Sequence, residues 1–138
     1  MKMWPKPLLN VHRHRVITCN IKAIRSHPVQ PIQGYHAHIY FDASTVDQAR
    51  ALCEDAARVL PVVMGRVHEK LVGPHTEWSC QLACGAEEVV QVLPWLAMNR
   101  RGLVVFMHPL SGDELADHRD HAIWMGAVRP LKLSVFGA

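Results

Sequence analysis

The side chains best suited to chemistry in this sequence are its histidines, several of which have spacings typical of metal ligands. His36 and His38 alternate within an extended segment, His75 follows a Gly-Pro pair, and His108 follows a short apolar run. Imidazole nitrogens bind iron, zinc, copper or nickel, whereas magnesium and calcium prefer oxygen ligands. Imidazole also gains and loses a proton near neutral pH. These residues predict a transition-metal site that also carries acid–base groups.

Two periodicities indicate the elements that position these histidines. Residues 35–41 alternate an apolar set with a second set, as expected for a strand with two different faces. The apolar set is Ala37, Ile39 and Phe41, and the other is His36, His38 and Tyr40. The apolar face must meet the helices, so the imidazoles belong on the open face. Apolar residues at helical spacing predict a helix over 45–59, with Ser44 as its capping residue and Pro61 beyond its end.

The remaining pattern predicts an α+β fold of the ferredoxin-like βαββαβ type, with an extra C-terminal helix and strand. The expected strands are 62–72, 77–84 and 103–107, the second helix lies between Glu87 and Gly102, and the extra elements begin near 111–114 and span 131–135. The open face of a four-stranded sheet needs a cover, and Val104 and Phe106 would add apolar area to it. A homodimer is therefore expected.

The predicted sheet brings distant histidines together. Its expected strand order is 103–107, 35–41, 77–84, 62–72, with the two central strands parallel and both crossover helices on one face. The starts of the two central strands and the end of 103–107 then share one edge. His36, His38, His75 and His108 are expected to meet at that edge. His118 and His121, three residues apart on the next helix, either complete this pocket or lie on a solvated helix face.

Four motifs occur together in this chain. They are Tyr-His-Ala-His-Ile-Tyr-Phe-Asp at 35–42, Gly-Pro-His at 73–75, His-Pro-Leu-Ser-Gly-Asp-Glu-Leu-Ala-Asp-His at 108–118 and Ala-Ile-Trp-Met-Gly at 122–126. Together they resemble the DOPA 4,5-dioxygenase family over residues 33–136. The resemblance implies a dimeric, ferredoxin-like α+β barrel. It also implies extradiol cleavage of a catechol such as L-DOPA by O₂, giving a yellow semialdehyde that cyclises.

The resemblance and the ligand types together imply a cofactor and a set of roles. Ferrous iron is the expected metal, with zinc or another divalent ion as the alternative; three protein ligands would leave positions open for the catechol and O₂. The expected metal ligands are His36, His38 and His108, with Glu77 as the best placed carboxylate and Glu114 behind it. The expected acid–base residues are His75 and His118, and the division of roles between His75 and His108 stays open. The expected substrate contacts are Arg66, Tyr40 and His121.

Charge divides the chain into two parts. The 138 residues carry a formal charge of +3, yet residues 1–41 contain six basic and no acidic side chains. We therefore expect a basic N-terminal arm, possessing little regular structure, at 1–32 and one dioxygenase domain at 33–138. No apolar run approaches the roughly 18 residues of a membrane span. The first 20 residues lack the features of a secretory signal, and the four cysteines form no CxxC pair, so a cytoplasmic location is expected.

Two other functions fit parts of the sequence. A zinc-bound hydrolase or isomerase of the same small barrel type would use the same imidazoles. A nucleic-acid-binding module would use the basic arm, because RNA-recognition domains share the βαββαβ order. Residues 77–81 lack the aromatic pattern with which such domains stack bases, which disfavours nucleic acid as a partner.

Overall fold

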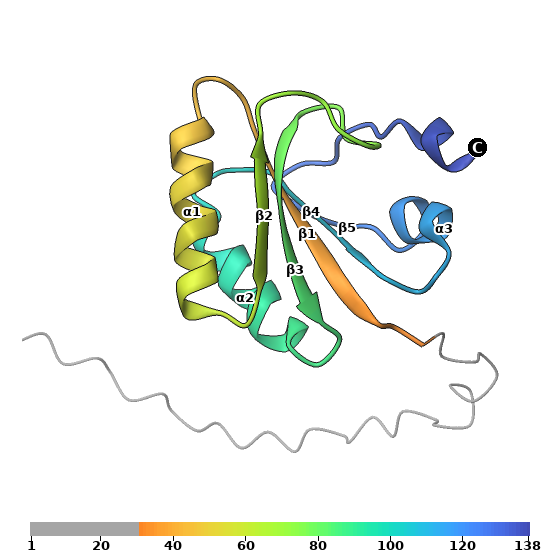
Figure 1. Ribbon diagram of the computed structural model, residues 1–138, viewed down its shortest axis with the longest axis horizontal. Helices are drawn as coiled ribbons and strands as arrows, with labels where there is room; N and C mark the ends of the chain where they lie inside the picture. Colours follow the sequence, from red (N-terminus) through yellow and green to blue (C-terminus); the bar gives the residue numbers. More distant parts are fainter. Residues whose placement is uncertain (1–30) are drawn as a thin grey trace, which may run out of the picture.

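A computed structural model describes residues 31–138, which form a mixed α+β fold around a five-stranded antiparallel sheet (Figure 1). In chain order the elements are β1 (Gly34–Phe41), α1 (Val46–Val59), β2 (Val63–His68), β3 (Trp78–Gly85), α2 (Val89–Asn99), β4 (Val105–Pro109), α3 (Glu114–Arg119), β5 (Ile123–Met125) and a 3₁₀ turn (Leu133–Phe136). The predicted basic arm, 1–32, lies almost wholly outside the described residues. None of the described helices is long and apolar enough to cross a bilayer.

The strand order is β2-β3-β1-β4-β5, which confirms the predicted order of the first four strands. The prediction that β1 and β3 run parallel is wrong, because Gly34 at the start of β1 pairs with Gly85 at the end of β3. The helix α1 returns the chain so that β2 runs in the direction of β1, and the direct connection from β2 to β3 then reverses it. Neighbours of β1 on both sides are therefore antiparallel to it.

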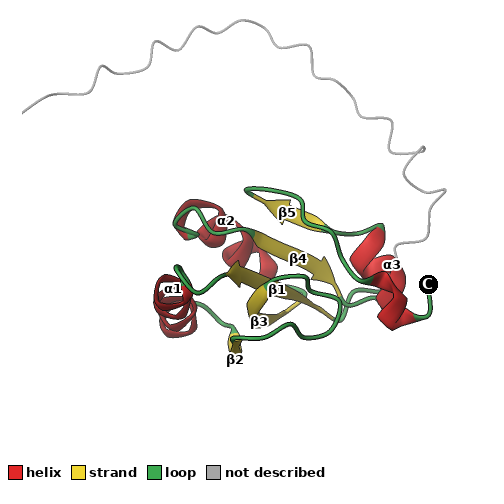
Figure 2. Ribbon diagram, turned by 90° about the horizontal axis from the view of Figure 1, so that it is seen from above, coloured by secondary structure: helices red, strands yellow, loops and turns green. Residues whose placement is uncertain are grey.

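The two faces of the sheet differ as the alternation in β1 predicts. Ala37, Ile39 and Phe41 are buried in one core with apolar residues of α1 and α2. Figures 1 and 2 show α1 and α2 on one side of the sheet, and α3 with the C-terminal residues on the other. The helical layer thus leaves the opposite face of β1 and β4 to the histidines.

The start of α1 differs from the predicted cap. Thr45 is the N-cap residue, and no side chain accepts a hydrogen bond from the first turn. The Asp42 carboxylate instead accepts bonds from the Ser44 amide at 2.8 Å and the Ser44 hydroxyl at 2.6 Å. Because Ser44 is held by the preceding aspartate, it belongs to the turn between β1 and α1 rather than to the helix.

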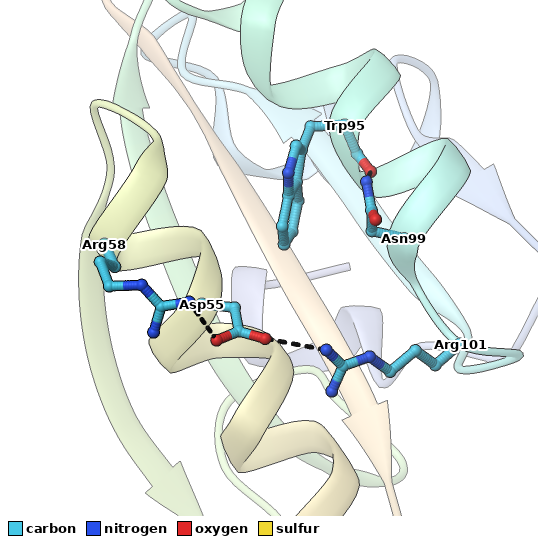
Figure 3. A network of polar contacts seen from close by, with 5 residues as sticks. All are labelled: Asp55, Arg58, Trp95, Asn99 and Arg101. Carbon is cyan, nitrogen blue, oxygen red and sulfur yellow. Dashed lines mark hydrogen bonds and ion pairs between the residues drawn. The ribbon is translucent and has the colours of Figure 1, made fainter.

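A polar contact joins the α1 layer to the turn after α2 (Figure 3). Asp55 on α1 accepts hydrogen bonds from Arg58, one turn later on the same helix, and from Arg101, each at 2.8 Å. The amide of Asn99 donates to the Trp95 carbonyl within α2. Of these contacts only the Asp55–Arg101 pair joins the two elements, and because it is partly exposed it adds little to the stability that burial of the apolar faces supplies.

The C-terminal region contains the predicted extra helix, α3, but the predicted strand at 131–135 is wrong. Leu131 makes one isolated bridge to His75, and Leu133–Phe136 forms a 3₁₀ turn. The bridge cannot extend into a ladder because its partner belongs to a loop rather than to a strand. The extra strand is instead β5, which pairs with the edge of β4 and precedes Gly126, a glycine with a φ of 88°.

Candidate metal centre

Three histidines converge where β1 and β4 pair. His36 lies directly opposite His108 in the register, and His38 lies two pairs further along, opposite Phe106. Opposed residues of antiparallel strands project to the same face, so the three imidazoles share one surface. One ring nitrogen from each of the three lies within 4.8 Å of those of the other two. The Nε2 atoms of His38 and His108 are 3.1 Å apart, a separation that suits two nitrogen ligands each about 2.1 Å from one ion.

Backbone carbonyls fix the tautomers of two of the pocket imidazoles. His108 Nδ1 lies 2.9 Å from the carbonyl oxygen of Pro109. Because a carbonyl oxygen only accepts, Nδ1 carries the hydrogen, and Nε2 of His108 presents its lone pair toward His38. In the same way, His118 Nδ1 donates to the Glu114 carbonyl at 2.6 Å. A bond of this kind orients a metal-binding imidazole and keeps its other nitrogen available.

Burial keeps these imidazoles neutral. His108 is 2% exposed, and its burial lowers its pKa to about 4, against weaker opposing effects of the Pro109 carbonyl and Asp117. Burial, with repulsion from neighbouring histidines, places the pKa of His38 well below its usual range. Each ring is therefore neutral at pH 7, with one N–H and one nitrogen lone pair, and the lone pair of His108 Nε2 accepts the hydrogen of His38 Nε2. Three neutral imidazoles in contact fit a transition-metal ion by their donor chemistry.

The triad lies in a pocket of about 250 Å³. The other residues that line it are Pro74, His75, Gln81, Leu110, Glu114, Asp117, His118 and Phe136. Ligand sites for larger, drug-like molecules usually measure about 300–1,000 Å³, so this pocket matches a single-ring substrate. The pocket walls come from β1, β3, β4, α3, the loops before β3 and after β4, and the 3₁₀ turn at Leu133–Phe136.

His75 reaches the pocket by a route that the sequence did not predict. The start of β3 lies beside the end of β1, since Trp78 pairs with Phe41, and is therefore at the opposite end from His36. The loop before β3 folds back over the open face and brings the His75 ring to 4.1 Å from that of His38. The predicted meeting of four histidines is thus present, but its cause is this loop and not a shared strand edge.

Tyr40 and the bridge from Leu131 hold His75 in place. The Tyr40 hydroxyl lies 2.8 Å from His75 Nδ1, and both side chains are buried. Burial, followed by the charge of Glu77, raises the pKa of Tyr40 far above its usual range. Burial lowers the pKa of His75 to about 4, with smaller contributions from other histidines. Both groups are accordingly neutral at pH 7.

Aromatic rings pack against the imidazoles of the pocket, and one of them, Phe136, also lines it. Phe106 is fully buried beneath the imidazoles and stacks on Trp124 with ring centroids 4.4 Å apart. The His118 ring lies 3.9 Å from that of His108 and 4.5 Å from Phe136. Phe106 contacts both His108 and His118, and Phe136 contacts His118, so these rings restrict the positions open to the two imidazoles.

The structure does not bring every predicted site residue to this pocket. Glu77, the expected carboxylate ligand, pairs with Arg129 at 2.8 Å and lines two other surface hollows. Arg66 is exposed on β2, and His121 is exposed after α3; neither lines the pocket. Glu114 lines it but is itself exposed. The sequence did not predict the ion pair between Arg129 and Glu77. This pair holds Glu77, the ligand that strand alternation favoured, away from the histidine pocket.

The sequence also gave no reason to select Asp117. This aspartate is 2% exposed and lines the histidine pocket. Its neighbours on the same short segment, Asp113 and Asp120, are exposed. Three similar aspartates within eight residues carry no periodic signal that distinguishes the buried one, although its position directly before His118 could have drawn attention to it.

Comparisons of sequence and structure relate this chain to known proteins. The model of the Dopa 4,5-dioxygenase family matches residues 35–135. This chain belongs to that family. It is 32% identical over 112 residues to a DOPA 4,5-dioxygenase of Amanita muscaria, an alignment covering 75% of this chain and 49% of that protein. It is 34% identical over 114 residues to an uncharacterized 21.2 kDa protein of Botryotinia fuckeliana, covering 74% of this chain and 62% of that protein.

A solved structure extends the likeness to three dimensions. The crystal structure of a candidate dioxygenase from Nostoc punctiforme shares 37% sequence identity with this chain and a TM-score of 0.75. The match covers 77% of this chain and 92% of the Nostoc chain. By contrast, this chain spans about half of the Amanita enzyme and three-fifths of the Botryotinia protein. The family membership and the structural match together support an oxygenase.

Proposed function

We propose that this protein is a metal-dependent extradiol dioxygenase that cleaves the ring of a catechol such as L-DOPA. One O₂ would be consumed per catechol, both of its atoms entering the product, a semialdehyde that then cyclises. The observation that carries the proposal is the triad of neutral imidazoles inside a ring-sized pocket. Membership of the Dopa 4,5-dioxygenase family supports the substrate class.

His36, His38 and His108 would hold the metal, which we take to be ferrous iron. When bound, such an ion acidifies the catechol hydroxyls and brings the catechol and O₂ together. The protein contributes the fixed lone pair of His108 Nε2, set by the Pro109 carbonyl, and the opposing Nε2 of His38. His36 is the more accessible ligand, being only partly buried.

His75 is the proposed acid–base residue. In this role, its Nε2 takes a proton from a catechol hydroxyl, while Nδ1 carries a hydrogen that it donates to the Tyr40 oxygen. A hydroxyl both donates and accepts, so Tyr40 can bond to His75 in either protonation state. Tyr40 thus acts through His75 as a positioning residue. This role replaces the direct substrate contact expected from the sequence.

His118 is the second proposed catalytic residue. Its Nδ1 is committed to the Glu114 carbonyl, so its Nε2 is the atom free to exchange a proton with substrate. The apolar ring of Phe136 borders it and would exclude bulk water from the reacting atoms. Glu77, Arg66 and His121 have no part in this proposal, since none of them lines the pocket.

Reconstitution under anaerobic conditions tests the proposed activity. The protein would be loaded with Fe(II), mixed with L-DOPA or another catechol, and then exposed to air. We expect one O₂ consumed per catechol and a yellow product. Loading with Zn(II) should give no oxygen uptake. Failure of several catechols to support oxygen uptake in the iron-loaded protein would contradict a dioxygenase and favour the zinc-bound hydrolase or isomerase.

A pair of histidine variants ties the activity to the triad. His38→Ala should abolish iron retention and oxygen uptake, because it removes a buried ligand. His121→Ala is the matched control: it deletes an imidazole that is exposed and outside the pocket. Equal iron content in both variants would refute the assignment of the triad.

We also propose that the protein is a ferredoxin-like homodimer, as the family resemblance implies. The strand order β2-β3-β1-β4 is compatible with that fold class. The histidine face is partly covered by the chain's own α3 and C-terminal residues, so a partner would meet only the rest of this face. Light scattering at micromolar protein concentration tests the dimer, and a monomer mass would contradict it.

A further inference from the structure

One carboxylate is buried beside the triad. Asp117 is 2% exposed, and its oxygens accept bonds from the Ser111 amide at 2.8 Å and the Ser111 hydroxyl at 2.5 Å. Within residues 31–138 no lysine or arginine forms an ion pair with it; the aspartates that do have such partners are Asp55 and Asp120. A carboxylate buried without a compensating cation is strongly unfavourable. A cation bound in this pocket would compensate the charge of this carboxylate.

The same carboxylate fixes the turn that orients His108. Ser111 stands two residues after Pro109, whose carbonyl accepts the Nδ1 hydrogen of His108. The intervening Leu110 donates its amide to the Gly34 carbonyl at 2.9 Å, which anchors the turn to the start of β1. Asp117 holds the other side of this turn through Ser111. The Pro109 carbonyl is thus fixed between β1 and α3.

Asp117 also connects this turn to the second catalytic candidate. It is adjacent to His118 on α3, whose N-terminal end is capped by the Asp113 side chain through the Ala116 amide at 3.0 Å. The His118 ring rests on that of His108. A single side chain is therefore bonded to the turn carrying the Pro109 carbonyl and belongs to the helix carrying His118.

We propose that Asp117 is a positioning residue of the metal centre, whose buried negative charge compensates the cation held by His36, His38 and His108 and whose bonds to Ser111 hold His108 in its ligating orientation. This inference rests on the metal centre proposed above. In this inference the carboxylate of the site does not bind the metal directly. Partners of this kind typically change metal affinity by about 10–100-fold.

Two substitutions at this position separate charge from geometry. Asp117→Asn removes the charge, yet its amide oxygen can accept from the Ser111 amide and its NH₂ group can donate to the Ser111 oxygen. Asp117→Ala removes both functions. The charge role predicts that Asp117→Asn leaves the thermal midpoint of the metal-free protein unchanged or raised, because a buried unpaired charge has gone. Asp117→Ala should lower that midpoint.

The decisive measurement is the dissociation constant for Fe(II) and, separately, for Zn(II), obtained by chelator competition without oxygen. Asp117→Asn should weaken binding of each ion by about 10–100-fold. Asp120→Asn is the matched control, since it makes the same change at an exposed aspartate near the end of α3. Its affinity should equal that of the unaltered protein.

The outcomes distinguish this inference from the proposed function. If the unaltered protein binds neither ion, the metal centre itself is refuted, and Asp117 has no role in it. If the unaltered protein binds metal and Asp117→Asn binds it equally well, the charge role of Asp117 is refuted while the metal centre stands. A lower midpoint of metal-free Asp117→Asn, matched by the loss of affinity, would reduce Asp117 to a structural residue and overturn the inference.

Discussion

Replacing Tyr40 by Phe tests how His75 is held. The substitution removes one hydroxyl and leaves the ring, so the contacts of Tyr40 with Phe106 and Trp124 are retained. His75 is 7% exposed and would lose the partner of its Nδ1 atom. A buried polar group left without its hydrogen bond costs about 1–3 kcal/mol. For a domain of about 110 residues, 1 kcal/mol corresponds to roughly 4 °C in the thermal midpoint.

We therefore expect Tyr40→Phe to lower the thermal midpoint of the metal-free protein by about 4–12 °C, equivalent to about 1–3 kcal/mol. The iron content should be unchanged, because the hydroxyl bonds to His75 and to none of the three triad histidines. The rate should fall by about tenfold if the lost bond contributes about 1.4 kcal/mol more in the transition state than in the ground state. Differential scanning calorimetry, metal analysis and oxygen uptake measure these three quantities.

The chain offers a matched control on the same strand. Tyr35 lies on the core side of β1, and its hydroxyl makes no side-chain hydrogen bond to the described residues. Tyr35→Phe therefore removes a hydroxyl without separating a buried pair, and it should leave both midpoint and rate nearly unchanged. Equal effects of the two substitutions would show that the Tyr40 hydroxyl does not hold His75. Loss of iron from Tyr40→Phe would instead place its effect at the triad.

Three further predictions follow from the pocket. The pKa of His75 and that of His108 are lowered to about 4 in the folded state, so between pH 6.5 and 4 the unfolded chain binds more protons. The free energy of unfolding of the metal-free protein, measured with urea, should then be highest above pH 6.5 and fall as the pH is lowered. The loss should reach at most about 3 kcal/mol per imidazole by pH 4. A constant free energy of unfolding over this range would contradict burial of neutral imidazoles. Phe106→Ala should cost about 3–5 kcal/mol in unfolding free energy, because the ring is fully buried on Trp124; a cost under 1 kcal/mol would mean that this ring is not tightly packed behind the imidazoles. Finally, the described residues that line the pocket include the carboxylates of Glu114 and Asp117 but no lysine or arginine, so KM should be roughly fivefold lower for a catechol with an ammonium side chain than for one with a carboxylate of equal length; the reverse order would indicate an additional cation at the site.

The face of each strand was predictable because alternation is a local property of the chain. His36, His38 and Tyr40 had to oppose Ala37, Ile39 and Phe41 whatever the sheet looked like. The strand order also followed from the sequence of elements and the direct β2–β3 connection, which contains no helix. The direction of β3 could have been derived from the same connection, so the parallel pairing was an error of inference rather than a gap in the sequence signal.

The composition of the site was less predictable, because loops and long-range charge pairs decide it. No periodicity indicates that the loop before β3 folds back to place His75 over His38. Strand parity favoured Glu77 as a ligand, and only the fold reveals that Arg129, 52 residues later, takes it. The burial of Asp117 likewise depends on its bonds with Ser111, which require α3 to pack against the end of β4. Local sequence patterns were therefore enough to predict the metal-binding histidines. Which carboxylate lies in the pocket, Asp117 rather than Glu77, depends on tertiary contacts.

The close packing of imidazoles makes the pocket favour a metal ion over a proton. Burial lowers the pKa of His38, and repulsion from His75, His108, His36 and His118 lowers it further, because each added proton would raise the charge of an enclosed cluster. A proton occupies one nitrogen and leaves the others unsatisfied, whereas a single metal ion can be shared by several lone pairs whose nitrogens already lie within 4.8 Å. The uncompensated charge of Asp117 favours either cation, but the geometry of the triad favours the shared one. Proton exclusion and metal affinity are thus two consequences of the same packing, and a substitution that opens the pocket to water should weaken metal binding even where it leaves all three ligands in place.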